Sequence, residues 1–149
     1  MNVLLVESDD VMRSFFQAAL EGEGFRVMAV KDNQGGRTVA EATRVDLVVA
    51  QFLDESDATG IADLLAALSA RSPWFKLLAV VSGFRTRAST AVSLRQMLNP
   101  WRTVDLTRGG QVLIDACRAA AREQRSDAST EEGDGMRTLP RHDAGRIVR

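Results

Sequence analysis

Short apolar runs alternate with helix-like segments through about residue 123, and this alternation constrains the fold more than any other feature of the sequence. Most of the runs are continuously apolar, as in strands that are buried on both faces of a sheet. They are Val3–Val6, Phe25–Val30, Leu47–Ala50, Leu77–Val81 and the less apolar Trp101–Leu106. Strict alternation favours a parallel sheet covered by helices, and right-handed crossovers leave few topologies. We therefore predict an α/β, flavodoxin-like (βα)5 doubly wound parallel sheet with strand order 2-1-3-4-5.

Amphipathic helical patterns separate these runs. Apolar residues three or four positions apart fall on one face of a helix and are expected to face the sheet. Such stripes are Met12, Phe16, Ala19 and Leu20; Ile61, Leu64, Leu65 and Leu68; and, within residues 88–98, Val92 with Met97 or Leu98. Residues 33–42 form a weaker helix, and Thr107 is expected to cap a last helix that runs to about Glu123.

The pattern stops at residue 125. The stretch that follows, Ser126-Asp127-Ala128-Ser129-Thr130-Glu131-Glu132-Gly133-Asp134-Gly135, has no apolar periodicity. Such a segment cannot bury enough apolar surface to offset the entropy lost on ordering. We therefore predict a folded domain over residues 1–124 and a disordered tail over residues 125–149.

Charge is distributed unevenly along the chain. The formal net charge is only −1, so bulk charge does not favour binding to nucleic acid or membranes. Residues 1–66, however, contain twelve acidic and five basic residues, a net charge of −7, whereas residues 67–111 contain seven basic residues and one acidic residue, a net charge of +6. The two parts are expected to present different surfaces to partners.

The single cysteine, Cys117, rules out a disulfide within the chain and favours a cytosolic setting. No apolar run approaches the roughly 20 residues of a membrane-spanning helix. The first residues also lack the basic start of a signal peptide. These observations predict a cytoplasmic protein without a membrane partner.

Polar side chains follow several of the predicted strands. Glu7, Ser8 and Asp9 follow the first strand, Gln51 follows the third and Ser82 follows the fourth. In an open parallel sheet, ligands bind beyond the carboxyl ends of the strands, near the point where the strand order reverses. This edge of the sheet is therefore the expected site.

These segments resemble the receiver domains of two-component response regulators. Val3–Asp9 resembles the opening strand of that family, which ends in two adjacent acids. Asp46–Gln51 resembles its third strand, in which an acid is followed five residues later by the phosphate-accepting aspartate. Leu78–Gly83 resembles its fourth strand, which ends in Thr or Ser and a small residue, and Gly60 resembles the glycine of the loop after the aspartate. The resemblance covers about residues 2–123.

The same resemblance aligns the fifth strand by counting on from Ser82. Trp101 then takes the position of an aromatic that changes rotamer with the Thr or Ser, Val104 takes the position of the family's lysine, and Asp105 takes that of the following proline. The implied phosphorylation pocket is Glu7, Ser8, Gln51, Ser82 and Val104.

This pocket lacks the groups that phosphoryl transfer requires. An active receiver needs a nucleophilic aspartate, Mg²⁺, a lysine and a hydroxyl. Gln51 is an amide that cannot form an acyl phosphate, Ser8 replaces a metal-ligating acid, and Val104 has no charge. Glu7 alone, or Glu7 with Asp9, offers a poor Mg²⁺ site, so we expect no metal or other cofactor, no catalytic residue and no enzymatic activity.

The leading hypothesis is a pseudo-receiver that signals by protein–protein contact without phosphorylation at residue 51. The expected partner is a histidine kinase, another response regulator or a second copy of the chain. The resemblance places the contact on the surface formed by the helix over residues 88–98, the fifth strand and the last helix. Candidate contact residues there are Arg85, Arg95, Trp101 and Arg102.

Two alternatives remain open. The chain could be a phosphate-accepting receiver with a non-standard acceptor, such as Asp54 or Asp57 in the segment after the third strand. It could instead be a nucleic-acid-binding regulator that uses its basic residues and its tail, although no recognition-helix motif is present.

Overall fold

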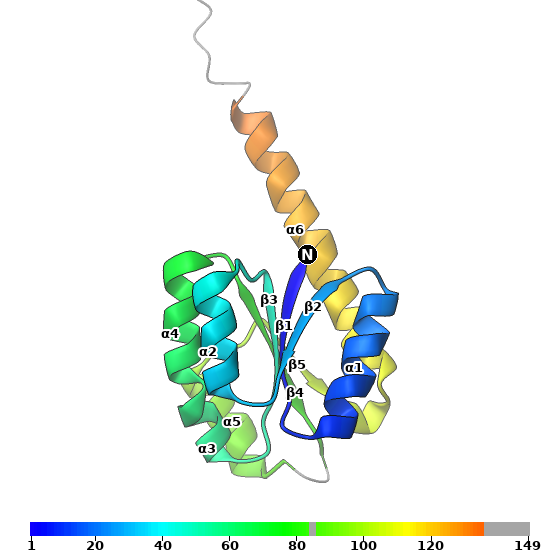
Figure 1. The fold of residues 1–149 in the computed structure, drawn as a ribbon, viewed down its shortest axis with the longest axis vertical. Helices are drawn as coiled ribbons and strands as arrows, with labels where there is room; N and C mark the ends of the chain where they lie inside the picture. Colours follow the sequence, from blue (N-terminus) through cyan, green and yellow to red (C-terminus); the bar gives the residue numbers. More distant parts are fainter. Residues whose placement is uncertain (84–85, 136–149) are drawn as a thin grey trace, which may run out of the picture.

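The fold is a five-stranded parallel sheet in the order β2-β1-β3-β4-β5, as the sequence predicts. The computed structural model describes residues 1–83 and 86–135 (Figure 1). The strands are β1 (Asn2–Val6), β2 (Arg26–Val30), β3 (Leu47–Gln51), β4 (Lys76–Val81) and β5 (Arg102–Asp105). The order reverses between β1 and β3, whose carboxyl ends lie side by side because Val6 pairs with Ala50.

Helices cover both faces of the sheet. They are α1 (Asp10–Gly22), α2 (Asn33–Ala42), α3 (Glu55–Gly60), α4 (Ala62–Arg71), α5 (Ala88–Met97) and α6 (Gln111–Gly135). Helices α1 and α6 lie on one face, and α2 to α5 lie on the other (Figure 1). None of the helices within the described residues is long and apolar enough to cross a membrane.

The central strands explain why the apolar runs are continuous. Along β3, Val48 and Ala50 pack toward α2–α5, whereas Leu47 and Val49 pack toward α1 and α6. Successive side chains of a strand point to opposite faces, so a strand covered on both faces needs apolar residues at every position. The same alternation holds in β1, where Leu4 and Leu5 belong to different core clusters.

The end of the sheet differs from the sequence expectation. Strand β5 ends at Asp105 and is followed by a 3-10 helix, η1 (Leu106–Arg108). The Asp105 carboxylate accepts the backbone N–H of Thr107 at 2.9 Å, so Asp105 is the capping residue and the predicted Thr107 cap is wrong. Gly109, at φ +97°, then turns the chain before α6 begins at Gln111. A short acidic side chain satisfies the first free N–H of η1, which the apolar pattern could not reveal.

Helix α5 has the predicted bounds to within one residue but not the predicted inner face. Leu94 and Thr90 are buried, whereas Val92 is 55% exposed and Met97 is 57% exposed. Thr90 and Leu94 lie one turn apart and face the sheet, so Val92, two residues from each, points away from it. The prediction that Val92 faces inward is wrong, whereas of the two alternatives Met97 and Leu98 it is Leu98 that packs partly against the core.

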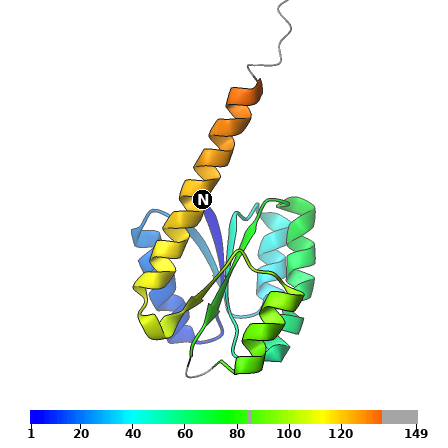
Figure 2. The ribbon, with the colours of Figure 1, turned by 180° about the vertical axis from the view of Figure 1, so that it is seen from behind.

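Helix α6 continues to Gly135, well beyond the predicted end near Glu123. Its far half projects past the amino-terminal edge of the sheet (Figures 1 and 2). A disordered tail from residue 125 is therefore wrong for residues 125–135, and residues 136–149 lie outside the described residues. Extending an existing helix costs far less than starting one, because each added residue gains a backbone hydrogen bond. Residues 111–121, which pack on the sheet, supply the nucleus.

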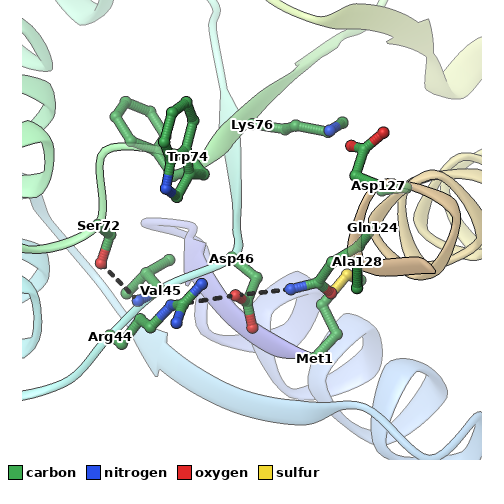
Figure 3. Close-up of a pocket in the computed structure, with 12 residues that line it drawn as sticks. Met1, Arg44, Val45, Asp46, Ser72, Trp74, Lys76, Gln124, Asp127 and Ala128 are labelled. Carbon is green, nitrogen blue, oxygen red and sulfur yellow. Dashed lines mark hydrogen bonds and ion pairs between the residues drawn. The ribbon is translucent and has the colours of Figure 1, made fainter. Parts of the chain in front are cut away.

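Asp46 ties α6 to the base of the sheet. Its carboxylate accepts the backbone N–H of Asn2 at 2.7 Å and the Gln124 side-chain amide at 2.9 Å. Figure 3 shows the hydrogen bond between Asp46 and Gln124 at the edge of a hollow of about 370 Å³, with Trp74 and Lys76 on one side and Asp127 and Ala128 of α6 on the other. The hollow lies at the amino-terminal edge of the sheet, opposite the edge where ligands of parallel sheets bind.

The buried thiol of Cys117 provides a test of how firmly α6 packs. Cys117 is fully buried in the core cluster under α6, and burial raises the pKa of its thiol to about 12. Because the thiolate is the reactive form, we expect alkylation of the folded protein to be roughly a hundredfold slower than that of an exposed thiol. Mass spectrometry after timed iodoacetamide treatment measures the rate. The matched control is Ser126→Cys, on the exposed part of α6, and equal rates at the two sites would contradict this packing.

Candidate functional site

Glu7 and Gln51 meet at the carboxyl ends of β1 and β3. Glu7 directly follows β1 and is only 2% exposed, and Gln51 is the last, half-buried residue of β3. With its nitrogen turned toward Glu7, the orientation that satisfies both side chains, the Gln51 amide donates to Glu7 Oε2 at 2.7 Å and to Oε1 at 3.0 Å. The two positions that the sequence predicts at this edge are therefore in direct contact.

The surrounding backbone also holds Glu7 in place. The Asp9 N–H donates to Glu7 Oε1 at 3.0 Å, and the Glu7 N–H donates to the Val30 carbonyl at 3.0 Å. The guanidinium of Arg13 donates to the Glu7 carbonyl at 3.0 Å. A buried carboxylate is costly unless donors satisfy its oxygens. Here amide donors from two different segments do so.

Gln51 therefore has a structural role at this edge of the sheet. A glutamine amide has two N–H donors, whereas an ionised aspartate only accepts hydrogen bonds. An aspartate at residue 51 would face Glu7 with no proton to share, and two neighbouring carboxylates repel each other. The amide converts this repulsive pair into a hydrogen-bonded one.

A pocket of about 230 Å³ opens beside Gln51. Its polar lining comes from three loops at this edge of the sheet. The polar lining residues are Ser8, Lys31, Asp32, Asn33, Gln51 and Asp57. Sequence reasoning missed Lys31, Asp32 and Asn33, although their place directly after β2 was a signal that they lie at the same edge.

The residues that follow Glu7 differ in what their side chains contact. The Asp9 carboxylate accepts the Met12 N–H at 2.9 Å and caps α1. Ser8 is exposed and has no charge. Across residues 1–83 and 86–135, no group of three or more His, Cys, Asp and Glu side chains is placed to hold a metal ion.

The end of β4 is closed by a threonine that the sequence analysis did not single out. The Thr86 hydroxyl accepts the Ser82 N–H at 2.9 Å and donates to the Phe52 carbonyl at 2.8 Å. This hydroxyl links the loops after β3 and β4. Ser82 itself lies at the predicted edge and is half-buried.

Asp105, and not Val104, is the β5 residue that reaches the end of β4. Val104 pairs with Val80 and packs toward α1 and α6, below the edge of the sheet. The Asp105 carboxylate accepts the Gly83 N–H at 3.1 Å. Hydrogen bonds from the Thr107 N–H and hydroxyl, and then from Gly83, lower the pKa of Asp105. The predicted position of Val104 in the pocket is wrong because β5 is displaced along β4, and an acid stands where the resemblance implies a cation.

Trp101 lies far from Ser82. Its backbone N–H donates to the Leu77 carbonyl, which places it five residues below Ser82, roughly 16 Å along the strand. Its indole N–H donates to Glu123 of α6 at 3.0 Å, and the Arg102 guanidinium stacks 4.5 Å from the ring centroid. The structure therefore does not bring Trp101 to a position where its rotamer could follow the Ser82 hydroxyl.

The predicted partner residues fall into two groups. Trp101 and Arg102 form a cluster with Glu123, whose carboxylate lies 3.7 Å from Arg102. Arg95 is exposed on α5, and Arg85 lies outside the described residues. Strand β5 is the edge strand between α5 and α6 (Figure 2), so these residues border one edge of the molecule.

The two alternative acceptors form a helix cap. Asp54 precedes α3 and accepts hydrogen bonds from the Ser56 and Asp57 N–H groups, while Asp57 accepts the Leu53 and Asp54 N–H groups. The hydrogen bond from the Ser56 hydroxyl is the largest cause of the lowered pKa of Asp54. The segment expected as a loop is a short helix, and its reciprocal cap engages both carboxylates.

Several solved structures are similar in fold to this chain. No protein-family model and no curated protein matches the sequence. The structure is similar to the signal receiver domain of an HD domain-containing protein from Pseudomonas fluorescens Pf-5 (TM-score 0.67, 19% identity, 84% of this chain and 97% of that chain). It is also similar to a response regulator receiver domain protein from Methanospirillum hungatei JF-1 (TM-score 0.66, 19% identity, covering 85% of this chain and 97% of that chain). A response regulator from Thermotoga maritima matches as well (TM-score 0.62, 16% identity, covering 80% of this chain and 95% of that chain). The chain therefore has the fold of receiver domains.

Replacing Gln51 with glutamate tests the role of the amide. The variant places a carboxylate against the buried Glu7, and we expect the free energy of unfolding to fall by about 1–3 kcal/mol near neutral pH. Repulsion raises the pKa of one member of such a pair, so the folded variant holds a proton that the unfolded chain releases. The loss in the free energy of unfolding, relative to the wild type, should therefore shrink as the pH falls toward the usual pKa values of carboxyl groups.

Urea unfolding of the wild type and of Gln51→Glu, between neutral and mildly acidic pH, measures the difference in their free energies of unfolding. The control is Gln96→Glu on α5, which makes the same change of charge at an exposed position. A Gln51→Glu protein as stable as the control at neutral pH would contradict the assigned hydrogen bonds.

Mg²⁺ provides a second test. Because Glu7 is already satisfied by amide donors, we expect millimolar Mg²⁺ to leave the melting midpoint within about 1 °C of its value in NaCl of matched ionic strength. Differential scanning fluorimetry measures the shift. A rise of several degrees that Ca²⁺ does not reproduce would show that the pocket holds the ion.

Proposed function

We propose that the chain is a response-regulator-like signalling module that acts by protein–protein contact and is not phosphorylated on an aspartate. One observation carries this proposal: the hydrogen-bonded Glu7–Gln51 pair occupies the place where the resemblance implies an acid pair and a metal. A receiver fold with this pair keeps the scaffold of the family, but the side chains of its pocket hydrogen-bond to each other and stabilise the fold. It acts as a regulatory binding module and not as an enzyme.

The charges around the pair support the same proposal. Phosphoryl transfer to a carboxylate needs cations that neutralise the phosphate oxygens. Asp105 presents an acid at the end of β4, and its contacts keep the pKa of that acid low. An anionic phosphoryl group near Gly83 would meet like charge. The arrangement therefore disfavours phosphate on electrostatic grounds as well as by lack of a nucleophile.

The proposed contact surface is the edge formed by α5, β5 and α6. Arg95 and Arg102 are exposed there, and Trp101 is held between Arg102 and Glu123. Arginine and tryptophan are enriched among the residues that dominate binding energy at interfaces. A histidine kinase, another response regulator or a second copy of the chain fits this proposal. Because Trp101 is fixed by its partners, output would depend on partner binding and not on an aromatic switch driven by phosphate.

Phosphorylation can be tested directly. We expect no mass increase after incubation with acetyl phosphate and Mg²⁺, because no described aspartate combines an open carboxylate with a metal site. We expect Gln51→Asp to remain unmodified at ordinary rates, since Ser8 offers no carboxylate as a second metal ligand and Asp105 adds negative charge at the end of β4. Intact mass spectrometry at neutral pH detects an adduct of about 80 Da.

The controls separate the alternatives. An acid-labile adduct on the wild-type protein that disappears in Asp54→Asn would establish the non-standard acceptor and overturn the proposal. An adduct that forms readily only on Gln51→Asp would show that the other pocket residues are competent and that residue 51 alone blocks the reaction. A phosphorylatable receiver domain treated in parallel confirms that the reagent is active.

A further inference from the structure

Two bulky apolar side chains are exposed on the outer surface of α1. Val11 is 77% exposed and Phe15 is 59% exposed, although most of the large apolar side chains of the described chain are buried. They lie four residues apart, so they project from the same side of the helix, one turn from each other. Single exposed apolar residues are ordinary, but adjacent ones that border a hollow mark an interaction site.

Such a hollow lies directly beside Phe15. It has a volume of about 320 Å³ and is lined by Val11, Met12, Phe15, Phe16, Leu106 and Gly110, none of which has a charged or hydrogen-bonding side chain. A Cβ built at Gly110 would lie 3.8 Å from the Phe15 ring, an ordinary contact, so a side chain longer than alanine at this residue would extend into the hollow. The hollow is large enough to accept an aromatic side chain.

Phe15 is held in position beside the hollow. Its ring packs edge to face against Phe16, with the centroids 5.7 Å apart and the planes at 64°. Phe16 is itself 3% exposed and anchored in the core. A projecting side chain that is already ordered loses little entropy when a partner covers it.

We propose that this surface joins two copies of the chain, with Phe15 of each copy inserted into the hollow of the other. The surface consists of α1, η1 and the start of α6, and we call it the α1 surface. A two-fold interface requires one surface that is complementary to itself. The α1 surface meets this requirement, because the projecting ring and the hollow that accepts a ring lie next to each other.

The charges on α1 and α6 also fit a second copy. Arg13 pairs with Asp10 at 2.6 Å at one end of α1, and Arg118 pairs with Glu23 at 2.7 Å at the other end. Arg118 also lies 3.6 Å from Asp115. Charges that are paired within the chain give no strong attraction to a highly acidic or basic partner, and they allow two identical surfaces to approach without repulsion.

The projecting half of α6 does not offer a competing way to join copies. Between Arg122 and Thr130 its only apolar residue is Ala128. A coiled coil needs apolar residues repeating every three and four positions. Self-association through this stretch is therefore unfavourable. The inference does not depend on the proposed function, because it involves neither Gln51 nor phosphorylation.

The test is the oligomeric state of the full chain in solution. Sedimentation velocity from about 1 to about 500 µM is expected to show a reversible dimer, as suits a small apolar interface. Phe15→Glu should weaken dimerisation by about tenfold or more, because it places a charge in the apolar hollow. The matched control is Val92→Glu, which changes an equally exposed apolar residue on α5 and should leave dimerisation unchanged.

A third variant separates insertion of Phe15 from general apolar adhesion. Gly110→Leu fills the hollow while making the surface more apolar, so it should also weaken the dimer. Circular dichroism melts confirm that each variant is folded, and Val11→Glu replaces Phe15→Glu if the latter is not. A wild-type chain that stays monomeric throughout the range overturns the proposal and assigns the surface to a different protein. Equal loss in Val92→Glu, or stronger association in Gly110→Leu, also overturns it.

Discussion

The buried carboxyl group of Glu7 is the constraint on which the functional edge of this molecule depends. It follows the central strand β1, where it is 2% exposed, and a carboxylate in that place must find donors or a cation. The chain supplies donors: the Gln51 amide at 2.7 and 3.0 Å and the Asp9 N–H at 3.0 Å. Because these amides donate to Glu7, an acid at residue 51 would replace a hydrogen bond with repulsion between two carboxylates. Gln51 is thus the residue that stabilises its buried neighbour.

The other end of the molecule is organised by a second set of polar contacts. Asp46 links the start of β1 to α6, and Glu123 joins α6 to Trp101 at the start of β5. These contacts hold α6 against the sheet and fix the aromatic residue that the resemblance associates with switching. Both Trp101 and Glu7 are therefore held by partners within the chain. These contacts agree with the proposal that partner binding, and not phosphate, sets the state of the module.

Several site residues could be predicted from the sequence, and others could not. Glu7 and Gln51 were predictable as neighbours, because the carboxyl ends of adjacent parallel strands share one edge. Val104 was placed wrongly in the pocket, because counting along the chain cannot detect a displacement of one strand relative to the next. The structure pairs Val80 with Val104, which leaves Asp105 at the edge. Lys31, Thr86 and Asp105 were missed as site residues for a related reason: single polar residues in loops carry no periodic signal, and only the fold brings them together.

The sequence by itself determined the class of fold, the strand order and the chemistry that residue 51 cannot perform. Apolar periodicity encodes which faces are buried, and an amide cannot form an acyl phosphate in any fold. Only the tertiary structure decided that Gln51 donates to Glu7, that Asp54 and Asp57 cap α3, and that α6 extends to Gly135. It also decided which apolar residues remain exposed, since Phe15 and Phe16 are adjacent in sequence but only Phe16 faces the core. These outcomes depend on distances between segments far apart in the chain, which local patterns do not contain.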